Sequence, residues 1–192
     1  MAETEFIFIT GGVRSGKSAY AEQQLQSLAK NYHTKRLVYV ATGVAFDNEM
    51  KKRIARHQLD RQKQQCNWIT LEQPTNLLQL LSSIQQGDVV LWDCVTTWLT
   101  NEFYEGFETG TCNWQQPLKL EKRITEMKTT ILQLHSMRVP LVIVSNEVLD
   151  EPISKSHEVK LYQEHLGNLH QWFVQQATQA IEMEYGHVHR WK

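Results

Sequence analysis

A glycine-rich stretch near the start of the chain has the spacing of a phosphate-binding loop. Gly11 is followed by four residues and then by Gly16-Lys17-Ser18, which fits the pattern G-x-x-x-x-G-K-[ST]. Glycines let the backbone curl so that successive N–H groups point at phosphate oxygens. Lys17 would supply a compact charge for the outer phosphates, and the Ser18 hydroxyl can ligate Mg²⁺. The stretch therefore predicts a nucleotide-phosphate site.

An acidic residue at the end of a neighbouring strand usually completes such a site near the metal. Asp93 follows the apolar run 89–92 and fits this role, so Ser18 and Asp93 are the predicted metal ligands. The alternative is that Asp93 caps a helix that begins around Thr96. The two roles are compatible with each other.

A histidine lies among basic residues in the segment 47–61. At helical spacing Met50, Ile54, His57 and Arg61 share one face. The pattern alone favours a packed or solvated helix residue over a catalyst at His57. Its basic neighbours are either a solvated face or a set of charges that holds a polyphosphate against a nucleophile.

Apolar runs that alternate with helical patterns predict the elements that position these side chains. Strands are expected at 6–9, 37–40, 89–92 and 139–144, with a weaker edge strand at 68–71 and a last strand around 187–189. Helices are expected at about 17–30, 47–63, 75–86, 114–137 and 156–182, and a long surface loop at 105–116. The pattern predicts an α/β, P-loop NTPase-like fold, with a mainly parallel central sheet and helices on both faces. Ligands bind such sheets at the carboxyl ends of the strands.

Composition limits the classes of function. The length of 192 residues predicts a single domain over 1–192, and the formal net charge of −1 argues against nucleic acid as a partner. No stretch of about 18 apolar residues exists, so no membrane span is expected. The three cysteines, Cys66, Cys94 and Cys112, match neither a disulfide framework nor a metal knuckle, which favours a reduced cytoplasmic setting.

At this point the chain resembles a family. The stretch Gly11 to Ser18 is similar to the signature of the bifunctional adenosylcobinamide kinase/adenosylcobinamide-phosphate guanylyltransferases of cobalamin synthesis. The likeness continues in order over about residues 6–148. It includes an Arg-Ile-x-x-His helix at 53–57, which ordinary P-loop kinases lack. Further matching stretches are Tyr39 to Thr42, Leu91 to Asn101 and Leu141 to Val148.

The resemblance implies a role for each matching position. His57 would be the catalytic residue that carries GMP, and Lys17 would act on the phosphates. Asp93 would stand near the phosphates and Mg²⁺. The nucleotide would be bound by the phosphate loop, Gly11, Gly12, Val13, Arg14, Ser15, Gly16, Lys17 and Ser18, and its guanine would lie among Ala41, Thr42, Gly43, Gln58, Leu59, Asp60, Arg61 and Glu72.

The same resemblance implies the reactions and the assembly. The substrates would be GTP or ATP together with adenosylcobinamide or its phosphate, and the assembly a homotrimer. A neutral imidazole is a good nucleophile towards the α-phosphorus of GTP, which is the chemistry that His57 would perform. The kinase step relies on positioning and charge stabilisation.

The likeness ends after Val148, where the family usually has a glycine-rich turn and this chain has Asp150 and Glu151. The changed segment 149–171 keeps two alternatives open. One is a diverged P-loop enzyme that retains one activity or uses another acceptor. The other is a GTP-binding regulatory protein. A nucleophile beside the nucleotide argues against this second alternative, because a protein that only binds GTP does not need one. The histidines His187 and His189 lack the further ligands that a metal site needs and are expected at a surface or interface.

Overall fold

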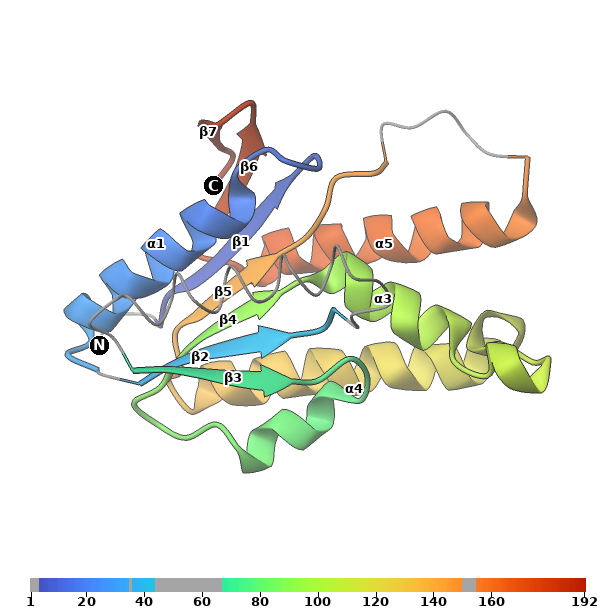
Figure 1. Ribbon diagram of the computed structural model, residues 1–192, viewed down its shortest axis with the longest axis horizontal. Coiled ribbons are helices and arrows are strands. Elements are labelled where there is room, and N and C mark those ends of the chain that lie inside the picture. The colour runs from blue at the N-terminus through green and yellow to red at the C-terminus, as the bar shows by residue number, and fades with distance from the viewer. Residues whose placement is uncertain (1–3, 35, 44–66, 150–154) are drawn as a thin grey trace.

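The computed structural model describes residues 4–34, 36–43, 67–149 and 155–192. Within them the backbone forms a seven-stranded sheet in the order β3-β2-β4-β5-β1-β6-β7 (Figure 1). All neighbouring strands are parallel except β6 and β7. The strands are β1 (Phe6–Gly11), β2 (Arg36–Ala41), β3 (Asn67–Glu72), β4 (Val89–Asp93), β5 (Leu141–Val144), β6 (Gln179–Glu184) and β7 (His187–Arg190).

Helices cover both faces of the sheet, as the sequence predicts. On one face α1 (Lys17–Asn31) packs Ala21, Leu25 and Leu28 against β1, β4 and β5. The other face is covered by α3 (Val95–Tyr104), α4 (Pro117–Ser136), α5 (His157–Gln176) and the 3₁₀ helix η1 (Leu77–Ser82). The central strands β1, β4 and β5 are buried on both sides, which explains why they appear in the sequence as continuous apolar runs.

Two expectations about elements are wrong, and a third holds with short 3₁₀ helices inside the expected loop. The expected helix 156–182 ends at Gln176, and a sixth strand follows it at Gln179–Glu184. The expected helix 75–86 is the short 3₁₀ helix η1, which begins after Asn76 in a left-handed conformation. The expected long loop at 105–116 contains two short 3₁₀ helices, Phe107–Thr109 and Asn113–Gln115.

Other expectations are confirmed or fall outside the described residues. The strand expected to be weak, β3, is at one edge of the sheet, and the expected last strand is β7 at the other edge. The helix expected at 47–63 lies outside the described residues. No helix within the described ranges is both long enough and apolar enough to span a membrane.

Candidate active site

The register of the parallel strands brings the carboxyl ends of the sheet into one row. Ala41 at the end of β2 is paired with Glu72 of β3 on one side and with Asp93 of β4 on the other. Asp93 is paired with Val144 at the end of β5, and β5 is paired with β1, from which the glycine-rich loop leaves. Predicted site residues from four separate stretches therefore lie along the same edge.

The loop after β1 has the backbone conformation that its glycines permit. Gly11 has φ 152° and Gly16 has φ 92°. A Cβ atom on Gly11 would lie 2.3 Å from the Met183 carbonyl oxygen of β6, so no other residue fits there. Between them the Ser15 N–H donates to the Gly12 carbonyl at 3.2 Å. The loop is thereby curled against the end of β6.

The lysine of the loop lies folded under it. Lys17 is the first residue of α1, and its Nζ donates to the Gly12 carbonyl oxygen at 3.0 Å. The residue is only 8% exposed, while Gly12 and Gly16 are exposed and Ser18 is half-buried. The first turn of α1 contains no acidic residue, so the positive end of the helix is not neutralised from within its own turn. This arrangement can bind an anion at the helix N-terminus.

Asp93 is oriented by a neighbouring tyrosine. The Tyr39 hydroxyl, from β2, donates to Asp93 Oδ2 at 3.0 Å. The alternative role as a helix cap is not what the structure shows, because α3 begins at Val95 and its N-cap position is Cys94. The carboxylate of Asp93 is thus held at the strand end and remains suited to bind a metal.

Thr42 joins the ends of β2 and β4. Its hydroxyl accepts from the Cys94 N–H and donates to the Cys94 carbonyl, each at 2.9 Å, and its own N–H donates to the Asp93 carbonyl. Asn101 of α3 donates from Nδ2 to the Thr42 carbonyl at 2.8 Å. Each polar group of Thr42 therefore has a protein partner. This geometry suits a residue that supports the turn, with Gly43 following it at the surface of the site.

Two residues after β5 are brought to the same edge, and sequence reasoning assigned them no role. The Glu147 N–H donates to the Gly11 carbonyl at 2.8 Å, which ties the turn after β5 to the phosphate loop. Asn146 Nδ2 donates to Thr96 Oγ1 at 2.7 Å. The available signal was the run of polar residues, Ser145 to Glu147, that follows a buried strand.

The thiol of Cys94 lies buried beside this edge. Its Sγ is 3.1 Å from both Thr96 Oγ1 and Thr97 Oγ1. Burial, and then the nearby Asp93 carboxylate, raise the pKa of the Cys94 thiol. The neutral thiol is a poor nucleophile, so the structure favours a packing and hydrogen-bonding role for it.

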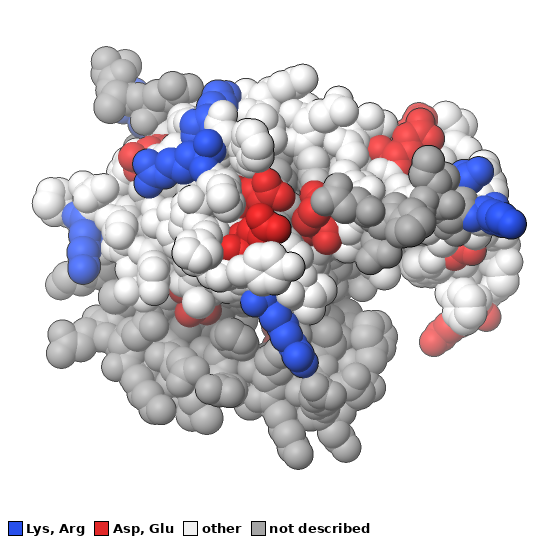
Figure 2. Space-filling model, turned by 90° about the horizontal axis from the view of Figure 1, so that it is seen from above, with Lys and Arg blue, Asp and Glu red and all other residues white. Residues whose placement is uncertain are grey.

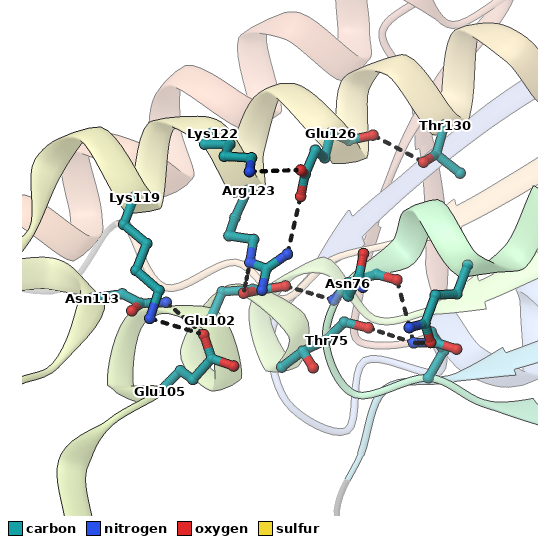
Figure 3. Close-up of polar contacts among 12 residues, drawn as sticks. Thr75, Asn76, Glu102, Glu105, Asn113, Lys119, Lys122, Arg123, Glu126 and Thr130 are labelled. Atoms are coloured by element: carbon teal, nitrogen blue, oxygen red, sulfur yellow. Dashed lines mark hydrogen bonds and ion pairs between the residues drawn. The ribbon is translucent and has the colours of Figure 1, made fainter. Parts of the chain in front are cut away.

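The buried carboxylate of Glu102 joins elements next to the candidate site (Figure 3). Glu102 of α3 accepts from the Asn76 N–H at 2.7 Å, and its other oxygen is 3.5 Å from Arg123 Nε of α4. Arg123 also contacts Glu126 at 3.1 Å. Burial raises the pKa of the Glu102 carboxyl. This cluster joins α3, α4 and the loop after β3, close to where Asn101 holds Thr42 and Pro74.

The remaining predicted residues lie outside the described part of the chain. These are the predicted nucleophile and its neighbours: His57, Gln58, Leu59, Asp60 and Arg61. Their roles stay predictions. Val13 and Arg14, in the phosphate loop, are described and exposed, and Arg14 adopts a left-handed conformation with φ 63°.

Comparison with known proteins gives a consistent result. A family model described as "Cobinamide kinase / cobinamide phosphate guanyltransferase" matches residues 7–190. The bifunctional adenosylcobalamin biosynthesis protein CobU of Escherichia coli is 29% identical over 176 residues, which cover 91% of this chain and 92% of that protein. The bifunctional adenosylcobalamin biosynthesis protein CobP of Pseudomonas aeruginosa is 43% identical over 96 residues, 48% of this chain and 50% of that protein.

A solved structure supports the fold. A KaiC-like protein of the archaeon Pyrococcus horikoshii superposes with a TM-score of 0.51 at 14% sequence identity, covering 95% of this chain and 72% of that one. At this identity the likeness concerns the fold alone.

Proposed function

The chain belongs to the cobinamide kinase / cobinamide phosphate guanyltransferase family, and we propose that it carries out both reactions in that name. One observation carries the proposal beyond the family match. The strand register puts Asp93 and Ala41 in the same row as the strand end from which the phosphate loop leaves. A phosphate site and a carboxylate suited to a metal therefore lie along one edge.

In the kinase reaction, the phosphate loop and Lys17 hold the triphosphate while a hydroxyl of adenosylcobinamide attacks the γ-phosphorus. The bond from that phosphorus to the bridging oxygen breaks, the nucleoside diphosphate leaves, and the hydroxyl proton is released. The protein has little covalent chemistry to perform in this step, so it accelerates the reaction by positioning the reactants and stabilising charge. Among the described residues, Lys17 and the N-terminus of α1 are groups that we propose to do so.

In the guanylyl transfer, His57 is the proposed nucleophile. Its imidazole nitrogen attacks the α-phosphorus of GTP, pyrophosphate leaves, and the GMP remains on the ring as a phosphoramidate. The phosphate of adenosylcobinamide phosphate then attacks the same phosphorus, which releases the histidine and gives adenosylcobinamide-GDP. Ala41, Thr42, Gly43 and Glu72, at the ends of β2 and β3, are the proposed surroundings of the guanine.

Mg²⁺ is the proposed metal, and the donors present suit it. The Ser18 hydroxyl and the Asp93 carboxylate are oxygen ligands, which Mg²⁺ prefers, and such sites take further ligands from phosphates. Figure 2 looks down on the side where β1 and the β6–β7 hairpin end, and acidic side chains gather near its middle. Carboxylates repel a polyphosphate unless a cation lies between them. When bound, Mg²⁺ would neutralise charge that develops on the phosphates.

Three further proposals concern the whole protein. The residues 1–192 form one catalytic domain, the assembly is a homotrimer, and the compartment is the cytoplasm. Cys94 and Cys112 are buried free thiols in the structure, which accords with a reducing compartment. Measurement of the mass in solution tests the trimer directly.

Labelling with α-labelled GTP and Mg²⁺ tests the proposed function. We expect label on the protein after denaturation, in an adduct that is labile in acid and stable in base, as a phosphoramidate is. His57→Ala should lose the label while still binding GTP, and His33→Ala, which changes an exposed histidine, should keep it. Label retained on His57→Ala would refute the assignment of the nucleophile.

Discharge of the adduct then tests the acceptor. Adenosylcobinamide phosphate should remove the label and yield adenosylcobinamide-GDP by mass. An adduct that no corrinoid discharges, together with no phosphorylation of adenosylcobinamide, would favour a diverged enzyme with another acceptor. GTP binding with neither adduct nor phosphoryl transfer would favour a regulatory protein.

A further inference from the structure

An exposed aromatic side chain lies directly beside the phosphate loop. Tyr185 is 90% exposed and lies in the two-residue turn between β6 and β7. The next residue, Gly186, donates its N–H to the Ser15 carbonyl of the loop at 3.1 Å. Gly11 is paired with Met183 of β6 in the strand register. The turn that carries Tyr185 is therefore fixed to the loop that would hold the phosphates.

The backbone conformation of the turn does not favour a tyrosine. Tyr185 has φ 48° and Gly186 has φ 82°, and Glu184 is paired with His187, which are the features of a type I′ hairpin. That turn prefers asparagine, aspartate or glycine at its first central position, because bulky side chains are disfavoured at positive φ. The aromatic ring is thus placed in solvent, in a backbone conformation that works against it.

The order of the strands determines which way a bound phosphate donor would point. Asp93, at the end of β4, lies on one side of β1, and β6 lies on the other side. Ser18 and Asp93 would hold the metal of the proposed function, which would neutralise charge on the outer phosphates. A γ-phosphate drawn towards Asp93 would face β4, and the nucleoside would then extend to the other side of β1, over the β6–β7 turn.

We propose that Tyr185 stacks on the purine base of the nucleotide that donates the phosphoryl group. This inference rests on the kinase reaction of the proposed function. Stacking of an aromatic ring on a base tolerates any base, because every base presents a π-face. Tyr185 therefore contributes affinity for ATP and GTP alike and does not discriminate between them.

The same site does not serve the guanine during GMP transfer. The proposed surroundings of that guanine are at the ends of β2 and β3, on the far side of β1 from β6 (Figure 1). Neighbouring strands are about 4.8 Å apart, so the five intervals from β3 to β6 span about 24 Å, more than one base can bridge. The two reactions thus place the base in two different positions around one phosphate loop.

Three variants test the proposal. Tyr185→Asn removes the ring and supplies a residue that the turn prefers, so the protein should be at least as stable to heat as the wild type. Tyr185→Phe keeps the ring. Trp191→Ala is the control, because Trp191 is a second exposed aromatic on the same hairpin, with Nε1 bonded to Glu182.

The readouts are steady-state phosphorylation of adenosylcobinamide and the GTP dependence of GMP labelling. For Tyr185→Asn we expect the KM for ATP and for GTP as phosphoryl donors to rise about 5- to 150-fold, with kcat little changed. Half-saturation of GMP labelling by GTP should stay at the wild-type value. Tyr185→Phe and Trp191→Ala should resemble the wild type in both assays.

Several results would overturn the inference. An unchanged KM in Tyr185→Asn would do so, as would an equal rise in the GTP needed for labelling. A change in the mass of the assembly in that variant would assign Tyr185 to a subunit contact instead. Failure of the wild type itself in both assays would remove the proposed function, and the inference with it, whereas the other results leave that function standing.

Discussion

The ammonium group of Lys17, which would bind a polyphosphate, is hydrogen-bonded to the protein's own backbone. Nζ donates to the Gly12 carbonyl, and the side chain is almost fully buried. A buried ammonium needs such partners, because its desolvation is costly. A phosphate that enters the loop offers the same ammonium a charged partner, and hydrogen bonds to charged groups are the stronger kind. When a phosphate binds, the Lys17 ammonium therefore exchanges the Gly12 carbonyl for a phosphate oxygen. The buried charge has a partner both before and after binding.

Lys17→Ala should therefore weaken nucleotide binding without unfolding the protein. Loss of a hydrogen bond to a charged group costs about 1.5 to 3 kcal/mol, which corresponds to about 10- to 150-fold in the Kd for GTP. Titration of the purified variant with GTP measures this, and circular dichroism should show unchanged helix content. Lys30→Ala, at the exposed end of α1, is the control. Wild-type affinity in Lys17→Ala would mean that the loop does not bind the phosphates.

At the scale of the elements, the turn after β2 depends on one hydroxyl. Thr42 uses that group both to accept from the Cys94 N–H and to donate to the Cys94 carbonyl, and the residue is fully buried. The ends of β2 and β4 are thereby held together where Gly43 and Asp93 reach the site. When one partner of a buried hydrogen bond is removed, the other group stays buried without a partner. The free energy of unfolding then falls by more than the net contribution of the bond.

Thr42→Val should lower the free energy of unfolding by about 2 kcal/mol, because the buried N–H and carbonyl of Cys94 lose their partner while the side-chain shape is kept. Urea unfolding followed by circular dichroism measures the change. Thr42→Ser keeps the hydroxyl and should recover most of the lost stability. Equal stability of the wild type and the valine variant would contradict this role.

The elements also show how far the sequence determines the fold. Buried strands such as β1 and β4 were predictable because their apolar runs are continuous. β6 was missed because residues 177–184 contain neither glycine nor proline to mark the end of α5, and so resemble its continuation. The loop, Lys17 and Asp93 were predictable from local patterns. The contacts that Asn146, Glu147 and Gly186 make at the site depend on strand pairing, which no local pattern specifies.

For the molecule as a whole, the long helix α5 carries a buried histidine against the central strands. His170 Nε2 is 2.7 Å from Ser145 Oγ, just after β5, and the ring packs at an angle on Phe8 of β1. Burial lowers the pKa of His170 from 6.5 to about 4. The neutral ring is thus part of the core where helix and sheet meet.

Acid should destabilise the protein through this residue. The unfolded chain binds a proton at His170 below about pH 6.5 and the folded protein only near pH 4, so stability is lost as the pH falls through this window. Near pH 4 this difference in pKa lowers the free energy of unfolding by about 3 kcal/mol. His170→Gln, which does not titrate, should reduce the loss measured by urea unfolding between pH 7 and pH 4. His157→Gln, at an exposed position, should retain the wild-type dependence. An identical pH profile in His170→Gln would refute the assignment.

The position of β1 in the sheet has a consequence for synthesis on the ribosome. Phe6 pairs with Leu141 and Ile7 with Gln179, so the strand that precedes the phosphate loop is made long before the two strands that flank it. Until β5 and β6 have left the exit tunnel, β1 is an apolar segment with two unpaired edges, the kind of segment that associates with other chains. The strands on both sides of β1 are therefore complete only after Glu184 has been translated. A chain that stops before residue 179 would still contain the complete loop sequence, yet it would lack the strand against which that loop is folded.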